Sequence, residues 1–288
     1  MKQTKIDRPI FIVGAGHSGT TFLGRILRQH PDLMTWEETN RIWTWGNVFR
    51  KSDILNREDL TPKIKNHILN HYEKFSQRTG NRRICDKTPR NCLRIPFVLA
   101  VFPDAKIIHL IRDGRAVMNS TQKSYTKSIS QYEVKNKLQR ALEIPIWQWY
   151  VFLPRLPLMI KRLLGIRLKY WGEKPSGWSE WESTLSPTQL LAKQWVEIVQ
   201  TAITEGRKVS AANYLEIFYE DLINQPEATM KKIAAFAELE NSGSIIDYCQ
   251  KRANPSINSK WKKTFSPQDL EEVGVILAPM MKNLGYEW

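Results

Sequence analysis

Short apolar runs alternate with segments of helical periodicity along most of the chain. The first run, Ile10–Val13, stops at a glycine-rich stretch, and apolar residues then recur at helical spacing from Thr20 until Pro31. This order predicts a buried strand, a tight turn and a helix. The same reasoning predicts further strands over 83–86, 106–111 and 214–218, and further helices over 62–79, 91–102, 115–128, 187–205, 226–239 and 267–284.

Strands that alternate with helices in this way are typical of a parallel sheet with helices on both faces. We therefore expect an α/β fold in one domain that spans residues 1–288. Prolines and five of the eleven tryptophans interrupt the pattern between 138 and 185. We interpret this segment as a helical, tryptophan-rich insertion that packs on the sheet.

The glycine-rich stretch Gly14–Thr21 has the spacing of a phosphate-binding loop between a strand and a helix. In such loops, successive backbone N–H groups and the positive end of the helix hold phosphate oxygens. Thr20 stands where a nucleoside triphosphatase carries the lysine that reaches the β and γ phosphates. The loop therefore predicts a site for a phosphate-like group other than a nucleotide γ-phosphate, with a simple chain reversal as the alternative.

A second phosphate site is predicted where the strand over 106–111 ends. Arg112 follows that strand, and Ser120 lies some two turns into the next helix. The carboxyl ends of neighbouring parallel strands share one crevice, so Arg112 would enter it beside the phosphate-binding loop. A guanidinium fork together with a hydroxyl suits a phosphate monoester.

Composition and charge narrow the class of protein. The 288 residues carry 43 Lys and Arg against 29 Asp and Glu, so the net charge of +14 favours an anionic partner: nucleic acid, lipid, nucleotide cofactor or acidic substrate. No apolar run approaches the roughly 18 residues of a membrane span. Three cysteines without a CxxC pair suit a reducing compartment. We expect a soluble, cytoplasmic protein.

The motifs resemble those of sulfotransferases that use 3′-phosphoadenosine 5′-phosphosulfate (PAPS), especially tyrosylprotein sulfotransferases and related bacterial enzymes. The loop and the Arg112 region are similar to the two cofactor-binding signatures of these families. Other similar segments are His30–Asp32 with Glu37–Thr39, Cys85–Asn91, Tyr219–Leu222 and Leu284–Tyr286. The resemblance implies a P-loop-type enzyme that transfers a sulfuryl group from PAPS to a hydroxyl or amine, releases adenosine 3′,5′-bisphosphate (PAP) and needs no metal.

The resemblance also implies roles for individual residues. Glu38 takes the position of the general base, and Lys87 that of the cation that stabilises charge on the bridging oxygen. His17 stands where most relatives carry arginine, and it would hold the sulfonate or share the proton. The implied cofactor-binding residues are Gly16, His17, Ser18, Gly19, Thr20, Thr21, Arg112, Ser120, Tyr219, Ser259 and Lys262. On the residues alone, Glu37 and Glu38 also fit a solvated pair in the loop after the first helix, and Lys87 fits a surface lysine.

Two other functions stay open: a kinase-like phosphotransferase that uses ATP and magnesium, and a basic nucleic-acid-binding protein. For the favoured sulfotransferase we expect a small-molecule, glycan, lipid or peptide acceptor and no nucleic acid partner. The sequence identifies neither the acceptor nor the oligomeric state.

Three further groups of residues allow both a functional and a structural interpretation. An apolar stripe and basic residues within 145–181 predict contact with an amphiphilic acceptor or a peripheral membrane contact, or else packing on the core. His67 and His71 are spaced like a metal pair but lack a third ligand, which favours a solvated helix face. The remaining group lines the acceptor pocket or packs in the core: Trp36, Trp43 and Trp45.

Overall fold

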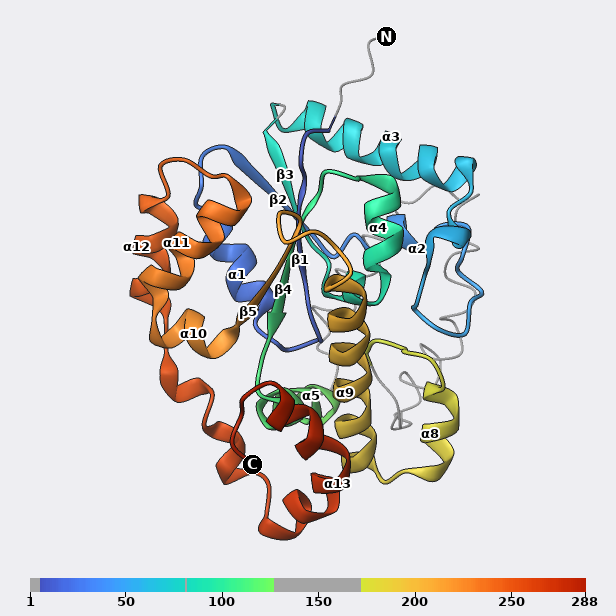
Figure 1. Cartoon of the computed structure of the whole chain (residues 1–288), viewed down its shortest axis with the longest axis vertical. Coiled ribbons are helices and arrows are strands. Elements are labelled where there is room, and N and C mark those ends of the chain that lie inside the picture. The colour runs from blue at the N-terminus through green and yellow to red at the C-terminus, as the bar shows by residue number, and fades with distance from the viewer. Residues whose placement is uncertain (1–5, 81, 127–171) are drawn as a thin grey trace.

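The computed structural model describes residues 6–80, 82–126 and 172–288. Figure 1 shows a single sheet with helices on both sides. All of its strands are parallel, in the order β2-β3-β1-β4-β5. They are β1 (Ile10–Val13), β2 (Leu33–Glu37), β3 (Arg83–Lys87), β4 (Lys106–Ile111) and β5 (Tyr214–Phe218). The expected α/β class with a helix-covered parallel sheet is confirmed.

Side chains of the strands alternate between two apolar layers. In β1, Ile10 and Ile12 face one layer, whereas Phe11 and Val13 face the other. The first layer includes residues of α1 (Thr20–Leu27), α10 (Tyr219–Asn224), α11 (Pro226–Ala237) and α12 (Gly243–Arg252). The second includes residues of α3 (Pro62–Arg78), α4 (Ile95–Val101), α9 (Pro187–Gly206) and α13 (Pro267–Asn283). Because both faces are covered, every residue of β1 is buried.

The three long helices α3, α9 and α13 begin at strong sequence signals. Thr61, Ser186 and Ser266 each accept a hydrogen bond from the backbone N–H three residues on, and a proline follows each of them. At its other end, α13 stops at Asn283, just before Gly285, whose φ of 80° is the left-handed conformation typical of a helix terminus. These helices therefore lie close to where the sequence predicts them.

Two expected elements require correction. Residues 33–37, where the sequence pattern predicts no strand, form the edge strand β2, whose side chains are only partly buried. The helix expected over 91–102 is divided into a 3₁₀ turn, η2 (Pro89–Arg94), and α4. Pro96 lacks the N–H that a continuous helix would require, so the chain starts a new helix there. Three short helices were not predicted: α2 (Asn40–Thr44), α10 and α12.

The parallel sheet brings several predicted site segments to one edge. β1, β3 and β4 lie side by side, and their carboxyl ends lead into the loop 14–19, into Thr88 and into α5 (Gly114–Thr126). In Figure 1 this edge faces the lower part of the view, toward α5 and α13. Among the described helices, none has the length and apolarity needed to cross a membrane.

Candidate functional site

The loop between β1 and α1 is built to hold an anion. His17 and Gly19 have positive φ values of 66° and 97°, and a side chain on Gly19 would overlap the ring of Tyr219. The amino end of α1 has neither a side-chain cap nor an acidic residue in its first turn. Its first N–H groups, together with the helix dipole, therefore face the loop without a negative partner from their own helix.

A carboxylate already lies against this loop. The Glu173 carboxylate accepts a hydrogen bond from the backbone N–H of Gly16, and burial raises the pKa of this carboxyl group. A Cβ built on Gly16 would lie 3.1 Å from Glu173 Oε2, so a larger residue there would displace this carboxylate by a few tenths of an ångström. The Ser18 hydroxyl is buried and has no hydrogen-bond partner among the described residues. The loop residues thus fit an anionic group, with Glu173 as a stand-in and Ser18 as an unused donor.

Arg112 lies beside the loop and is 7% exposed. Its Nε donates to Asn258 Oδ1 at 2.9 Å, its Nη1 donates to the carbonyl of His17 at 3.1 Å, and its guanidinium lies 4.5 Å from the centre of the Tyr219 ring. Within the described ranges, Arg112 forms no salt bridge with a carboxylate. A nearly buried cation without an anionic partner is unfavourable unless a ligand neutralises it.

His17 joins the two predicted phosphate sites. Its carbonyl accepts from Arg112, and its Nδ1 lies 3.2 Å from the Ser120 hydroxyl. Partial loss of hydration, followed by the positive charge of Arg112, lowers the pKa of His17 below its ordinary value. His17 is therefore neutral near pH 7, where an arginine would be charged.

Glu38 and Lys87 form the second half of the site. Lys87 Nζ lies 2.7 Å from Glu38 Oε1 and 3.4 Å from Thr21 Oγ1, which brings the pair to the start of α1. The Lys87 side chain is 3% exposed, whereas that of Glu38 is 61% exposed. The lysine is thus held in the protein, and the carboxylate that it contacts is open to solvent.

Two interpretations from the residues alone are wrong. Lys87 is a buried member of β3 and not a surface lysine. Glu37 is the last residue of β2, where it pairs with Arg28 and lies 3.4 Å from Lys87 Nζ, so it is not a merely solvated neighbour of Glu38. The reason is the edge strand β2, which places both glutamates beside the end of β3.

Most of the predicted cofactor-binding residues lie around the loop and Arg112, and Asn258 joins them. Ser259 and Lys262 are exposed and contact neither Arg112 nor the loop: Ser259 Oγ bonds to the carbonyl of Ser256, and Lys262 lies over Trp261. Asn258, in the same segment, bonds both to Arg112 and to Glu220 Oε1. The resemblance indicated this segment, but only the packing shows which of its side chains reaches Arg112.

The tryptophans near Glu38 in the sequence pack against neighbouring aromatic residues. Trp43 is fully buried in an aromatic cluster with Phe11, while Trp36 stacks on Phe75 with ring centres 4.1 Å apart. Trp45 stacks on His67 at 4.2 Å. Packing, one of the two predicted interpretations, accounts for Trp43.

His67 also lies close to His71, with ring centres 4.5 Å apart. Burial, followed by the charge of His71, lowers the pKa of His67 to about 4. In the part of the chain that the structure describes, no three His, Cys, Asp or Glu side chains gather as a metal site. The two rings belong to the aromatic packing around α3, rather than to a freely solvated helix face.

Only the end of the predicted insertion falls within the described residues. There α8 (Trp178–Thr184) packs beside α9, and the Trp178 indole donates to the carbonyl of Lys51 at 2.7 Å. The membrane or amphiphile contact predicted for 145–181 lies mostly outside the described residues.

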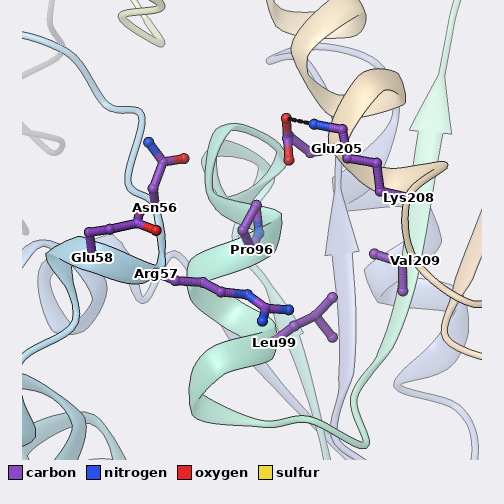
Figure 2. Close-up of a pocket in the computed structure, with 8 residues that line it drawn as sticks. All are labelled: Asn56, Arg57, Glu58, Pro96, Leu99, Glu205, Lys208 and Val209. Atoms are coloured by element: carbon purple, nitrogen blue, oxygen red, sulfur yellow. Dashed lines mark hydrogen bonds and ion pairs between the residues drawn. The ribbon is translucent and has the colours of Figure 1, made fainter.

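A separate hollow of about 420 Å³ lies between α4 and the end of α9. Figure 2 shows Arg57 and Leu99 on one side of it and the Glu205–Lys208 ion pair on the other. None of the predicted site residues lines this hollow.

Comparison with known proteins identifies the class. A model of the sulfotransferase family matches residues 9–156 and 159–242. This match spans more than half of the sequence, so the chain belongs to the sulfotransferase family. The family predicted from the motifs is confirmed, and so is the assignment of the chain to the enzymes.

Curated relatives agree with this assignment, and solved structures share the fold. Protein-tyrosine sulfotransferase A of Caenorhabditis elegans is 24% identical over 307 aligned positions, which cover 96% of this chain and 67% of the relative. The sulfotransferase domain from the curacin biosynthetic pathway superposes with a TM-score of 0.58 at 14% identity, covering 99% of both chains. Mouse sulfotransferase SULT7A1, solved in complex with PAP, gives a TM-score of 0.53 at 14% identity over 98% of this chain and 86% of its own.

Proposed function

We propose that the protein transfers the sulfuryl group of PAPS to a hydroxyl group of an acceptor and releases PAP. The observation that carries the proposal is Arg112, a nearly buried cation without a carboxylate partner in the described structure, next to a loop that accommodates an anion. Two anion sites, one at the loop and one at Arg112 with Ser120, suit a nucleotide with phosphate groups on both its 5′ and 3′ positions.

Each side chain has a role that its surroundings support. The loop N–H groups and Ser18 would hold the 5′ phosphosulfate, while Arg112 and Ser120 would hold the 3′ phosphate. When bound, PAPS supplies an activated sulfuryl group whose bond to the departing phosphate breaks as the acceptor oxygen attacks. Glu38, exposed and aligned by Lys87, accepts the proton of the acceptor. Lys87 stabilises negative charge beside the start of α1.

The acceptor proposal rests on the relatives. The C. elegans relative is named as a protein-tyrosine sulfotransferase, which makes a phenolic hydroxyl the first acceptor class to consider. Glu38 suits an acceptor of this kind because its carboxylate is open to solvent and can meet a hydroxyl brought from outside.

We also propose that the protein works in the cytoplasm. Supporting this, Cys85, Cys92 and Cys249 are buried free thiols, so the fold does not depend on a disulfide. Fractionation of cells that express the natural chain checks this proposal, and recovery in a membrane or secretory fraction contradicts it.

Calorimetry with three nucleotides tests the function. We expect PAP to bind the protein in the presence of EDTA more tightly than adenosine 5′-phosphate or ATP does. In Arg112→Ala, the preference for PAP over adenosine 5′-phosphate should fall by about 10- to 100-fold, because a hydrogen bond to a charged group contributes roughly 1.5–3 kcal/mol. Arg115→Ala is the matched control, since Arg115 pairs with Asp113 at 2.8 Å.

The outcomes separate the alternatives. An unchanged preference in Arg112→Ala contradicts the assignment of the 3′-phosphate site. Tighter binding of ATP with magnesium than of PAP contradicts the sulfotransferase function and favours the kinase-like phosphotransferase.

A further inference from the structure

A buried carboxylate lies behind the Glu38–Lys87 pair. Asp86 precedes Lys87 in β3, so its side chain points to the opposite face of the sheet, where it is 0% exposed. Its two oxygens accept hydrogen bonds from four side chains: Thr39 (2.6 Å), Thr88 (2.6 Å), Trp43 (3.2 Å) and Tyr72.

Two of these donors directly follow the candidate catalytic residues. Thr39 follows Glu38, and Thr88 follows Lys87. Two backbone N–H groups also link the segment after β2 (residues 38–39) to the segment around the end of β3 (residues 87–88), which we call the two corners. The N–H of Glu38 donates to the carbonyl of Lys87 at 3.0 Å, and the N–H of Thr39 donates to Thr88 Oγ1 at 3.0 Å. One carboxylate therefore ties the corner after β2 to the corner after β3.

The corner after β2 requires such restraint. Glu38 has a φ of 58°, a left-handed conformation that a residue with a side chain adopts only when its surroundings impose it. Its own side chain is largely exposed and contributes little packing. Besides the hydrogen bond from its own N–H to the Lys87 carbonyl, this backbone is held by the contacts of Thr39, whose hydroxyl bonds to Asp86.

Stability alone does not account for Asp86. A buried charge is costly to desolvate, and a well-packed apolar side chain of similar volume is often as stabilising or more so. Burial accordingly raises the pKa of Asp86, while its four hydrogen-bond donors favour the ionised form. Asp86 is costly to bury and is hydrogen-bonded to both corners of the site, so it suits a role in aligning them.

We propose that Asp86 is a positioning residue, whose buried carboxylate holds the Glu38 corner against the Lys87 corner and so aligns the base with its cation. The inference rests on the proposed function for its consequence in turnover. The structural part of the inference, that Asp86 holds the two corners together, is independent of the proposed function, because it can be measured without substrate.

Amide hydrogen exchange and PAP release test the role together. In Asp86→Asn we expect the Glu38 and Thr39 amides to exchange about 10-fold faster while the amides of β1 and β4 keep their protection. Release of PAP from PAPS, with p-nitrophenol as acceptor, should fall by about 10- to 100-fold, as small misplacement of a reacting group does. The Kd for PAP should stay near that of the parent.

Tyr72→Phe gives a milder test that keeps the carboxylate and serves if Asp86→Asn does not fold. Tyr214→Phe is its matched control, because Tyr214 is likewise buried and its hydroxyl bonds to His109 at 2.8 Å instead of to Asp86. Only Tyr72→Phe should speed exchange at Thr39 and slow PAP release, each by a few-fold, roughly in proportion to one lost donor of four.

Five outcomes distinguish the possibilities. Faster exchange confined to the two corner amides, together with slower PAP release, supports the proposal. Unchanged exchange, or a uniform increase across the sheet, overturns it, and so does faster exchange with parental PAP release. A parent chain that binds no PAP instead contradicts the proposed function, and the role of Asp86 in that reaction fails with it.

Discussion

Two of the three residues that the sequence indicated as catalytic, His17 and Glu38, have an unusual backbone conformation. Only five non-glycine residues have positive φ in the described part of the chain, and His17 and Glu38 are two of them. Each such residue costs on the order of 1 kcal/mol, so it persists where surrounding contacts impose it. At Glu38, this conformation places the carboxylate beside Lys87 and open to solvent. The strain is thus located where a reactive group must point away from its strand.

Glu38→Gln tests the base directly. Because glutamine cannot accept the acceptor's proton, release of PAP from PAPS should fall by about 10²- to 10⁴-fold. The Kd for PAP should stay near the parental value, since Glu38 contacts Lys87 and lies outside the two anion sites. Glu37→Gln is the matched control, because it removes the same charge one residue away and next to the same lysine. Equal loss of PAP binding in Glu38→Gln would show that Glu38 is structural.

At the scale of elements, the sequence predicted the helices and strands whose ends or burial are marked by local sequence signals. The long helices carry a cap and a proline at their start, β1 is a continuous apolar run, and β4 is apolar apart from Lys106 and His109. β2 has no such signal, because a partly covered edge strand does not need an apolar run. Missing β2 led to the wrong description of Glu37 as solvated.

The candidate site likewise has a part that the sequence predicted and a part that it did not. The loop 14–21 and Arg112 follow strands with clear patterns, so their convergence follows from the parallel sheet. Asn258 and Glu173 contact Arg112 and the loop from segments far away in the sequence. Their contacts depend on tertiary packing, which cannot be predicted from the spacing of residues along the chain. Glu173 also lies outside the motifs of the family resemblance.

Glu173 gives a prediction about how the loop and the segment before α8 interact. Because its carboxylate lies on the loop, a bound phosphate group has to displace it. Glu173→Gln should therefore tighten PAP binding roughly 3- to 10-fold, as expected when a competing state loses its charge interaction. Calorimetry measures the change, with Glu180→Gln on α8 as a control for the general loss of one negative charge. Equal tightening in both variants contradicts a specific contact at the loop.

At the scale of the whole molecule, the sheet buries a histidine that the site does not use. His109 of β4 is 0% exposed, its Nδ1 lies 2.8 Å from the Tyr214 hydroxyl, and its Nε2 has no partner in the described structure. Burial, opposed by Glu216 and assisted by Arg207, lowers the pKa of His109 from 6.5 to about 4. The folded state therefore keeps this imidazole neutral over a pH range in which the unfolded chain protonates it.

The sign of the effect on global stability follows from proton binding. Between pH 6.5 and 4 the unfolded chain binds more protons at His109 than the folded chain does, so the free energy of unfolding decreases as the pH falls. The full contribution is present above pH 6.5, and the slope for one such group is at most about 1.4 kcal/mol per pH unit. We expect His109→Gln, measured by urea unfolding from pH 8 to 5, to lower stability at pH 7 and to flatten the slope below pH 6.5 by up to this amount. The range from pH 7 to 8 is the internal control, where parent and variant should run parallel. Parallel curves below pH 6.5 as well would show that protonation of His109 does not govern the acid sensitivity of the fold.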